Sequence, residues 1–188
     1  MASAIPRTSA HSDEHAIGVP TPELTSDGTK VEGLSMVVFS GDLDKALAAF
    51  IIANGAAAMD LPVHMFFTFW GLNVLRRGTK LHPAPKKTTM EGMFGRMMPN
   101  GPNELHLSKM NMAGMGTRMI KREMIKKHVS DLAHLLQSAQ QQGVQFIACQ
   151  MSMDLMGIKK EELIDGITVG NVGSFIDAAD RSRITLFI

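Results

Sequence analysis

Five short, almost wholly apolar runs, separated by longer segments, constrain the fold of this chain more than any other feature of its sequence. They are Leu34 to Phe39, Leu61 to Trp70, Val144 to Cys149, Ile167 to Gly170 and Arg183 to Ile188. A strand buried on both faces is apolar throughout and does not alternate with polar residues. Such strands occur where helices cover both faces of a parallel sheet. The pattern therefore predicts an α/β fold, with three α/β/α layers and a mostly parallel five-stranded sheet.

Helical segments are expected between these runs. Ser40-Gly41-Asp42 is interpreted as a turn and helix cap, followed by a helix with a wide apolar face from Leu43 to Asn54. One long helix is predicted from Met119 to Gln142, ended by a glycine. Shorter helices are predicted after Cys149 and from Asn171 to Asp180. The residues expected to point inward from the long helix are Ile120, Met124, Val129, Leu132, Leu135 and Leu136.

The chain divides into an N-terminal tail and one folded domain. Residues 1–33 are rich in Ser, Thr, Pro, Gly and Ala without hydrophobic periodicity, which is typical of a flexible tail. The domain is expected over residues 34–188. Within it, residues 79–117 are rich in Met, Pro and Gly and are too long for an ordinary connection, so they are interpreted as a long Met-rich insertion loop.

Methionine is unusually concentrated in this part of the chain. Nine of the sixteen methionines fall between Met90 and Met124. Packing in the core or between subunits is the first interpretation, and an adaptable, polarizable surface for a changing partner or a polysulfide chain is the second. A thioether site for Cu(I) ranks well below both, because such sites usually combine Met with closely spaced His or Cys. No metal site is therefore predicted.

Charge is distributed unevenly along the chain. Between Arg76 and Lys127, twelve Lys and Arg stand against three acidic residues, a net charge of +9 in a chain whose total is +1. A local basic region suggests an anionic ligand or an acidic protein partner, although a solvated surface explains it equally well. Nucleic acid is not expected, because Phe94 is the one aromatic residue there and offers no stacking platform.

Cysteine content and hydropathy indicate the compartment. A single cysteine excludes an intrachain disulfide framework and fits a reducing, cytoplasmic environment. We expect no signal peptide, because no basic stretch followed by an apolar one opens the chain. The most apolar stretch, Ala46 to Leu72, is interrupted by Asn54, Gly55, Asp60 and Pro62. A helix, a turn and a strand therefore explain it better than a membrane span.

Polar or reactive residues follow four of the predicted strands. Ligands of open α/β sheets bind beyond the carboxyl ends of the strands. The residues expected at this edge form four groups: Ser40-Gly41-Asp42, Thr68-Phe69-Trp70, Cys149-Gln150 followed by Ser152, and Gly170-Asn171-Val172-Gly173. Helix capping is a sufficient explanation for Asp42. His64, within the second run, is interpreted as a hydrogen-bonded core or interface histidine.

Cys149 is the candidate catalytic residue. It closes an apolar strand and precedes a predicted helix, so its thiol should face the unpaired N–H groups of the helix start. Those donors and the helix dipole favour the thiolate, which is the reactive form of cysteine. The competing interpretation is a small buried hydrophobic side chain, the more common fate of a cysteine.

Taken in order, these segments resemble the DsrE/DsrF/DsrH-like family of sulfur-relay proteins, and most closely its DsrE2-type branch. The residues that carry the resemblance are Val37 to Asp42, Phe66 to Gly71, Ile147 to Met153 with Met156-Gly157, and the Met-rich Met110 to Gly116. The match covers about residues 34–188 and leaves the tail outside. Some relatives carry a membrane-spanning insertion, but the charged residues of 79–117 argue against a span here.

The resemblance implies a homo-oligomeric sulfur carrier. In that role Cys149 accepts sulfane sulfur from an anionic donor as a persulfide and passes it to a TusA-like sulfur carrier or another sulfurtransferase. A single cysteine is chemically sufficient for this transfer, which needs no metal, nucleotide or other cofactor.

Two further readings remain open. In the first, the fold is a non-catalytic assembly module, so replacing Cys149 is harmless and disturbing the Met-rich loop breaks assembly. In the second, it is a small-ligand binding module that holds an anion at Ser40-Gly41-Asp42 and Gly170-Asn171. A ligand would then stabilise the protein whatever residue stands at position 149.

Overall fold

The computed structural model describes residues 33–78 and 86–188. Its centre is a sheet of five strands in the order β4-β3-β2-β1-β5, and every pairing is parallel. The strands are β1 (Gly33–Val38), β2 (Val63–Phe67), β3 (Gln145–Cys149), β4 (Ile167–Gly170) and β5 (Ser182–Phe187). The predicted α/β class and five-stranded sheet are confirmed. The predicted tail, residues 1–33, falls outside the described residues except for Gly33, which begins β1.

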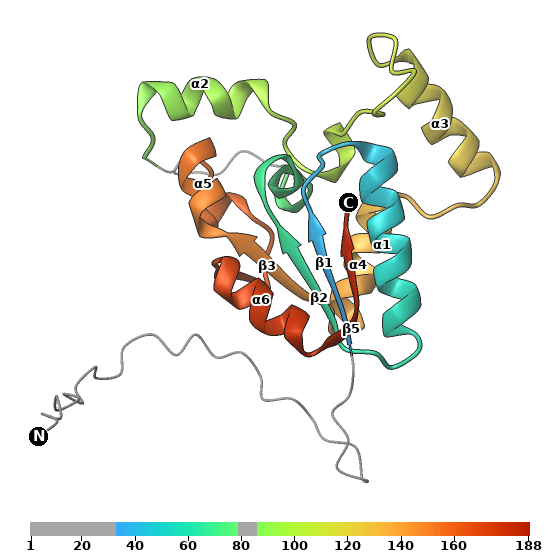
Figure 1. Ribbon diagram of the computed structural model, residues 1–188. Coiled ribbons are helices and arrows are strands. Elements are labelled where there is room, and N and C mark those ends of the chain that lie inside the picture. The colour runs from blue at the N-terminus through green and yellow to red at the C-terminus, as the bar shows by residue number, and fades with distance from the viewer. Residues whose placement is uncertain (1–32, 79–85) are drawn as a thin grey trace, which may run out of the picture.

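Helices cover both faces of the sheet and complete the three predicted layers. In Figure 1, α1 (Leu43–Ala57) and α4 (Leu132–Gln141) lie on one face, and α6 (Val172–Asp180) lies on the other. α5 (Gln150–Met156) continues directly from β3. Between α1 and the sheet, the rings of Phe50, Phe67 and Phe146 are fully buried and contact one another with centroids 5.7 to 6.1 Å apart.

The order of the strands reverses at β1. The chain moves outward from β1 through β2 and β3 to β4, and then returns through α6 to place β5 on the other side of β1. In α/β sheets, the crevice at such a reversal is the usual place for a ligand. The carboxyl ends of β1 to β4 meet at one edge of the sheet, as expected from the sequence.

The second apolar run is shorter as a strand than predicted. β2 ends at Phe67, and a 3-10 helix, η1 (Phe69–Leu75), follows in place of the last strand residues. Phe69 has a left-handed backbone with φ of 44°, and the N–H of Gly71 donates to the carbonyl of Phe39 at 2.9 Å. The chain therefore turns at Thr68, and Trp70 lies in a helix and not at a strand end.

The long helix predicted from Met119 to Gln142 is wrong, because the structure has two helices there. α3 (Met115–Lys126) ends before His128, whose φ is 55°. α4 then starts at the N-cap Asp131, whose side chain accepts a hydrogen bond from the His134 N–H at 2.8 Å. Of the residues expected to point inward, Leu132 and Leu136 are buried, whereas Ile120 and Val129 are exposed.

The Met-rich segment is also more ordered than the predicted loop. It contains α2 (Thr89–Met97) and the 3-10 turn η2 (Pro102–Glu104), and α3 starts inside it; residues 79–85 fall outside the described part. Thr88 and Glu91 form a capping box that fixes the start of α2: the Thr88 N–H donates to the Glu91 carboxylate at 2.6 Å, and the Glu91 N–H donates to the Thr88 hydroxyl at 3.3 Å.

Most of the methionines in this segment do not pack into the core. Seven of the nine between Met90 and Met124 are exposed: Met90, Met93, Met97, Met110, Met112, Met115 and Met119. α3 itself buries only Thr117 and projects from the body in Figure 1. Packing in the core therefore does not account for these seven methionines, whereas packing between subunits, the other part of the first interpretation, stays a prediction.

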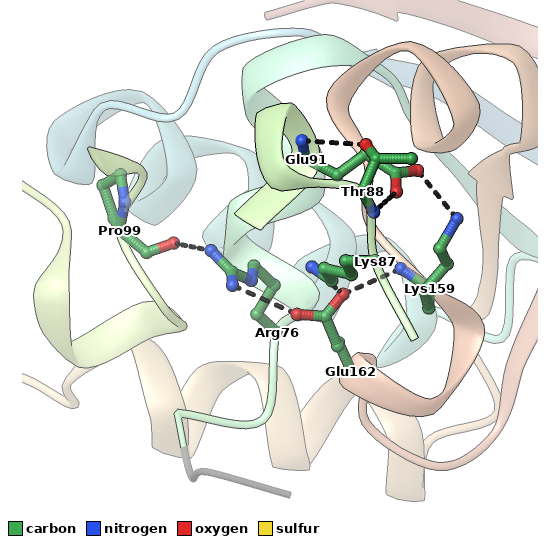
Figure 2. Close-up of polar contacts among 7 residues, drawn as sticks. All are labelled: Arg76, Lys87, Thr88, Glu91, Pro99, Lys159 and Glu162. Carbon is green, nitrogen blue, oxygen red and sulfur yellow. Dashed lines mark hydrogen bonds and ion pairs between the residues drawn. The ribbon is translucent and has the colours of Figure 1, made fainter. Parts of the chain in front are cut away.

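Ion pairs hold α2 against the segment that follows α5 (Figure 2). The ammonium of Lys159 lies 2.9 Å from the carboxylate of Glu91 and, with the Thr88 N–H, lowers the pKa of that carboxyl from 4.5 to about 2. Gly157 makes this approach possible. Its φ is 64°, and a Cβ atom there would stand 2.6 Å from the Cβ and Cγ atoms of Glu91. A residue with a side chain at this position would therefore push α2 away.

A second set of charges lies deeper (Figure 2). Glu162, in the 3-10 turn η3 (Lys160–Glu162), accepts from Lys87 at 2.6 Å and from Arg76 at 3.4 Å, and all three side chains are at most 14% exposed. Arg76 also donates to the Pro99 carbonyl at 3.0 Å. The chain before residue 79 and the chain after residue 85 therefore both contact the carboxylate of Glu162, through Arg76 and Lys87.

No helix in the described ranges 33–78 and 86–188 combines the length and the apolar character needed to cross a bilayer.

Candidate functional site

Cys149 lies where the sequence placed it, at the end of a central strand and the start of a helix. It is the last residue of β3, pairs with Gly170 of β4, and occupies the N-cap position of α5. Its side chain makes no capping hydrogen bond. The residue is only 1% exposed, so the thiol is closed off from solvent in this conformation.

Apolar side chains on the α6 face of the sheet enclose the thiol. Cys149 clusters with Val37, Phe66 and Ile147, which come from three neighbouring strands, and Phe175 of α6 packs against this group. The rings of Phe66 and Phe175 have centroids 5.5 Å apart. Phe175 is only partly buried, so the cluster that contains Cys149 borders a helix that is itself near the surface.

A hydrogen bond between two buried hydroxyls fixes the helix after the thiol. Ser152, in the first turn of α5, lies with its Oγ 2.7 Å from the Oγ1 of Thr68, which follows β2. Ser152 is fully buried and Thr68 nearly so. The predicted site residue Ser152 thus holds α5 at the edge of the sheet. Thr68 was also expected at this edge, but its pairing with Ser152 was not predicted.

Gln150 and Asn171 lie at the expected edge but bind within their own helices. The Gln150 side chain donates to the Asp154 carboxylate at 2.9 Å. The side-chain oxygen of Asn171 accepts from the Ser174 N–H at 3.1 Å and caps α6. Both are exposed at the surface near the end of their strands.

The remaining predicted residues, Ser40, Gly41, Asp42 and Trp70, come together around a separate cavity of about 410 Å³, which we call the Trp70 hollow. It is also lined by Phe39, Lys45, Asn73 and Pro99. Sequence reasoning missed Lys45 and Asn73. The available signal was Asn73 itself, a lone amide inside the apolar stretch Leu72 to Leu75.

Helix capping does not explain Asp42, contrary to the expectation from sequence. Asp42 stands at the N-cap position of α1, but its carboxylate makes no capping bond. It accepts from the Ser40 hydroxyl at 3.0 Å and pairs with the Lys45 ammonium at 2.8 Å. The hydrogen bond from Lys45 to the Asp42 carboxylate raises the pKa of Lys45 above its usual value of 10.5. Both charged groups stand on the rim of the Trp70 hollow.

The thiol and the Trp70 hollow are two separate places. β2 lies between β1, which leads into the hollow, and β3, which ends at Cys149. Cys149 is not among the residues that line the hollow. The four groups predicted at the carboxyl edge therefore do not form one site: Cys149 is buried, Ser40-Gly41-Asp42 and Trp70 line an open cavity, and Asn171 caps α6.

The hydrogen bond expected of His64 is not present at its Nδ1 within the part of the chain that the structure describes. His64 lies in β2 and is partly buried. Burial and the nearby charge of Arg181 lower its pKa below the usual 6.5. Within the described residues, no cluster of three or more His, Cys, Asp or Glu side chains is arranged to hold a metal ion.

The fold and the site together define a class: a parallel α/β domain whose cysteine ends a central strand beside the start of a helix. Residues 30–187 match the model of the DsrE/DsrF/DrsH-like family, which is nearly the whole described domain. The chain belongs to this family.

Two relatives cover most of the chain. One is the uncharacterized protein YrkE of Bacillus subtilis, 51% identical over 154 residues, which are 82% of this chain and 95% of that protein. Another is the sulfur carrier protein DsrE2 of Allochromatium vinosum, 36% identical over 159 residues, which are 82% of this chain and 97% of that protein. The crystal structure of the ychN protein from E. coli is similar over 84% of this chain and 99% of that chain, with 13% identity and a TM-score of 0.49.

Proposed function

We propose that this protein is a sulfur carrier that holds sulfane sulfur as a persulfide on Cys149 and passes it to a partner. The observation that carries the proposal is the position of its sole cysteine, at the carboxyl end of β3 and the N-cap of α5, in a chain 36% identical to a sulfur carrier. Parallel α/β sheets bind ligands and react at this edge, and the cysteine stands there.

The transfer needs no group beyond the thiol. The Cys149 thiolate attacks the outer sulfur of a donor persulfide, R–S–S⁻. A bond forms between Sγ and that sulfur as the donor S–S bond breaks, and R–S⁻ leaves with the electron pair. The product is Cys149–S–S⁻, with no net oxidation. An acceptor thiolate removes the outer sulfur in the same way and returns Cys149 as thiolate. No metal or other cofactor takes part.

Access to the thiol requires α6 to move. Cys149 belongs to the buried cluster against which Phe175 packs, and the helix of Phe175 is short and partly exposed. Displacement of this one ring is the smallest change that would admit a donor. The burial has a chemical use, because a persulfide shielded from water and from free thiols is not discharged between partners.

The partners we propose are an anionic sulfur donor and a TusA-like sulfur carrier or another sulfurtransferase, working with a homo-oligomer of this chain in the cytoplasm. Support comes from the basic surface of α3, where Arg118, Arg122 and Lys126 are exposed. Nucleic acid is not among the proposed partners, because the basic segment from Arg76 to Lys127 has one aromatic residue in its sequence and a single ring offers no stacking platform.

Intact-protein mass spectrometry after incubation with polysulfide tests the proposal, with Cys149→Ser as the matched control. We expect mass increments of whole sulfur atoms on the wild type, removed by dithiothreitol, and none on C149S. Reduction is the essential control, because two methionine oxidations add nearly the mass of one sulfur and are not reversed by dithiothreitol. A wild type that stays unmodified, or an adduct that persists in C149S, would reject the proposal and favour the assembly or ligand-binding alternatives.

A further inference from the structure

The Trp70 hollow has the position of a ligand site. It lies beyond the carboxyl end of β1, the strand on whose two sides the chain order reverses. Its volume of about 410 Å³ is within the range of small-molecule sites. None of its lining residues belongs to the group that encloses Cys149, so the hollow is separate from the buried thiol.

A buried amide without a partner marks the floor of the hollow. Asn73 is 1% exposed, lines the cavity, and its Oδ1 has no hydrogen-bond partner among the described residues. An unsatisfied buried acceptor destabilises the folded chain, and an apolar residue at this position would avoid that cost. The Oδ1 atom is closed off in the free protein, so the amide has to turn toward the hollow to accept from a ligand; its presence there points to a ligand that donates a hydrogen bond.

Opposite charges stand together on the rim. The Asp42 carboxylate and the Lys45 ammonium are paired at 2.8 Å, and both line the hollow. The Lys45 side chain is 48% exposed, and an ammonium has three donors, so donors remain for a second acceptor. A neutral pair of this kind matches a ligand that carries both charges better than it matches a simple anion.

The hollow is preformed. The backbone of Phe39 and that of Gly71 are hydrogen-bonded at 2.9 Å, and a Cβ atom on Gly71 would lie 2.1 Å from the Val38 carbonyl oxygen. The left-handed Phe69 directs the following Trp70 outward, where its ring is 50% exposed at the rim. An aromatic face beside a carboxylate is a favourable surface for a ligand ammonium.

We propose that the Trp70 hollow binds a small zwitterion of the α-amino-acid class. The ligand ammonium faces Asp42 and the Trp70 ring, the ligand carboxylate faces Lys45, and a hydrogen-bond donor of the ligand reaches Asn73. This site is independent of Cys149 and of the sulfur chemistry proposed for it.

The sole tryptophan provides the reporter. With one Trp and no Tyr in the chain, intrinsic fluorescence comes from Trp70 alone. The full-length protein is titrated with each of the twenty common L-amino acids, with Trp and Tyr followed by calorimetry because they fluoresce themselves. For each amino acid that binds, two truncated compounds are titrated next. One lacks the amino group, and the other lacks the carboxylate. We expect saturable binding of at least one amino acid and at least about tenfold weaker binding of both truncated compounds.

Variants separate the ligand site from the fold. Asn73→Leu removes the unpartnered amide, so we expect it to raise the melting temperature of the free protein while weakening binding at least about tenfold. Lys45→Met should weaken binding similarly, whereas Lys126→Met, on the exposed surface of α3, should not change it. The proposal is overturned if no amino acid binds, if either truncated compound binds equally well, or if N73L and K45M bind like the wild type. Retention of binding in Cys149→Ser distinguishes this site from the thiol.

Discussion

The side chains of Thr68 and Ser152, 84 residues apart in the sequence, lie with their hydroxyl oxygens 2.7 Å apart in the interior. Thr68 follows β2, and Ser152 lies in the first turn of the helix that Cys149 caps. The bond joins the edge of the sheet to the helix beside the thiol. It therefore determines how firmly that helix start is held.

The losses in unfolding free energy caused by removing each hydroxyl alone should add up to more than the loss caused by removing both. Thr68→Val leaves the Ser152 hydroxyl buried without a partner, and we expect a loss of about 1–3 kcal/mol in the free energy of unfolding, with a similar loss for Ser152→Ala. The double variant should lose at least about 1 kcal/mol less than the sum of the two. Urea denaturation measures each value. Thr168→Val, at an exposed position of β4, is the matched control and should be close to neutral. Strict additivity would show that the two hydroxyls do not interact.

Loss of the buried carboxylate of Glu162 should be strongly destabilising. It faces Arg76 and Lys87, and all three side chains are at most 14% exposed, so Glu162→Gln leaves buried positive charge without compensation. We expect a loss of about 3–5 kcal/mol in the free energy of unfolding. Asp165→Asn removes a carboxylate that is 90% exposed beside Arg77, and it should have little effect. Equal effects of the two substitutions would mean that the inner charges are solvated.

Stability should fall in mild acid because of His64. Its pKa in the folded chain lies below the ordinary 6.5, chiefly because of burial, so the unfolded chain takes up protons more readily in this range. The contribution to stability is therefore complete above about pH 6.5 and is lost as the pH falls toward the folded pKa. His64→Leu should flatten the dependence of the unfolding free energy on pH between about 5 and 7. A variant with the same slope as the wild type would assign the loss to other groups.

Phe175 should control the rate at which reagents reach Cys149. Phe175→Ala opens the cover of the thiol, and we expect alkylation by N-ethylmaleimide in the native state to accelerate at least about tenfold. Ile176→Ala, at a position 58% exposed on the same helix, is the matched control and should react like the wild type. If F175A does not accelerate labelling while its circular dichroism remains native, the thiol is reached by another route.

The sheet and its order of helices follow from the sequence because parallel strands buried on both faces must be apolar throughout. This rule also placed Cys149 at the end of β3. The same rule predicted a second strand that runs too far, to Trp70. The strand ends earlier because the left-handed conformation of Phe69 depends on contacts with the end of β1 that no local sequence pattern shows.

Two other wrong predictions, the missing helix α2 and the continuous helix in place of α3 and α4, could have been avoided from the sequence. Thr88 and Glu91 have the spacing of a capping box and announce α2. Asp131 is a strong N-cap residue inside the helix that was predicted to be continuous. By contrast, the pairing of Thr68 with Ser152 and the separation of the thiol from the Trp70 hollow depend on tertiary packing, so periodicity could not reveal them.

Sulfur transfer from loaded protein to an acceptor tests the central claim most directly. Wild-type protein is loaded with polysulfide, freed of excess donor, and mixed with a reduced TusA-like carrier, and both masses are followed over time. Cys149→Ser is treated identically. We expect one sulfur atom to leave this chain and appear on the carrier thiol, at equal rates, with no transfer from C149S. Sulfur that never loads on the wild type, or that reaches the carrier equally well from C149S, would contradict the assignment of Cys149 as a sulfur carrier.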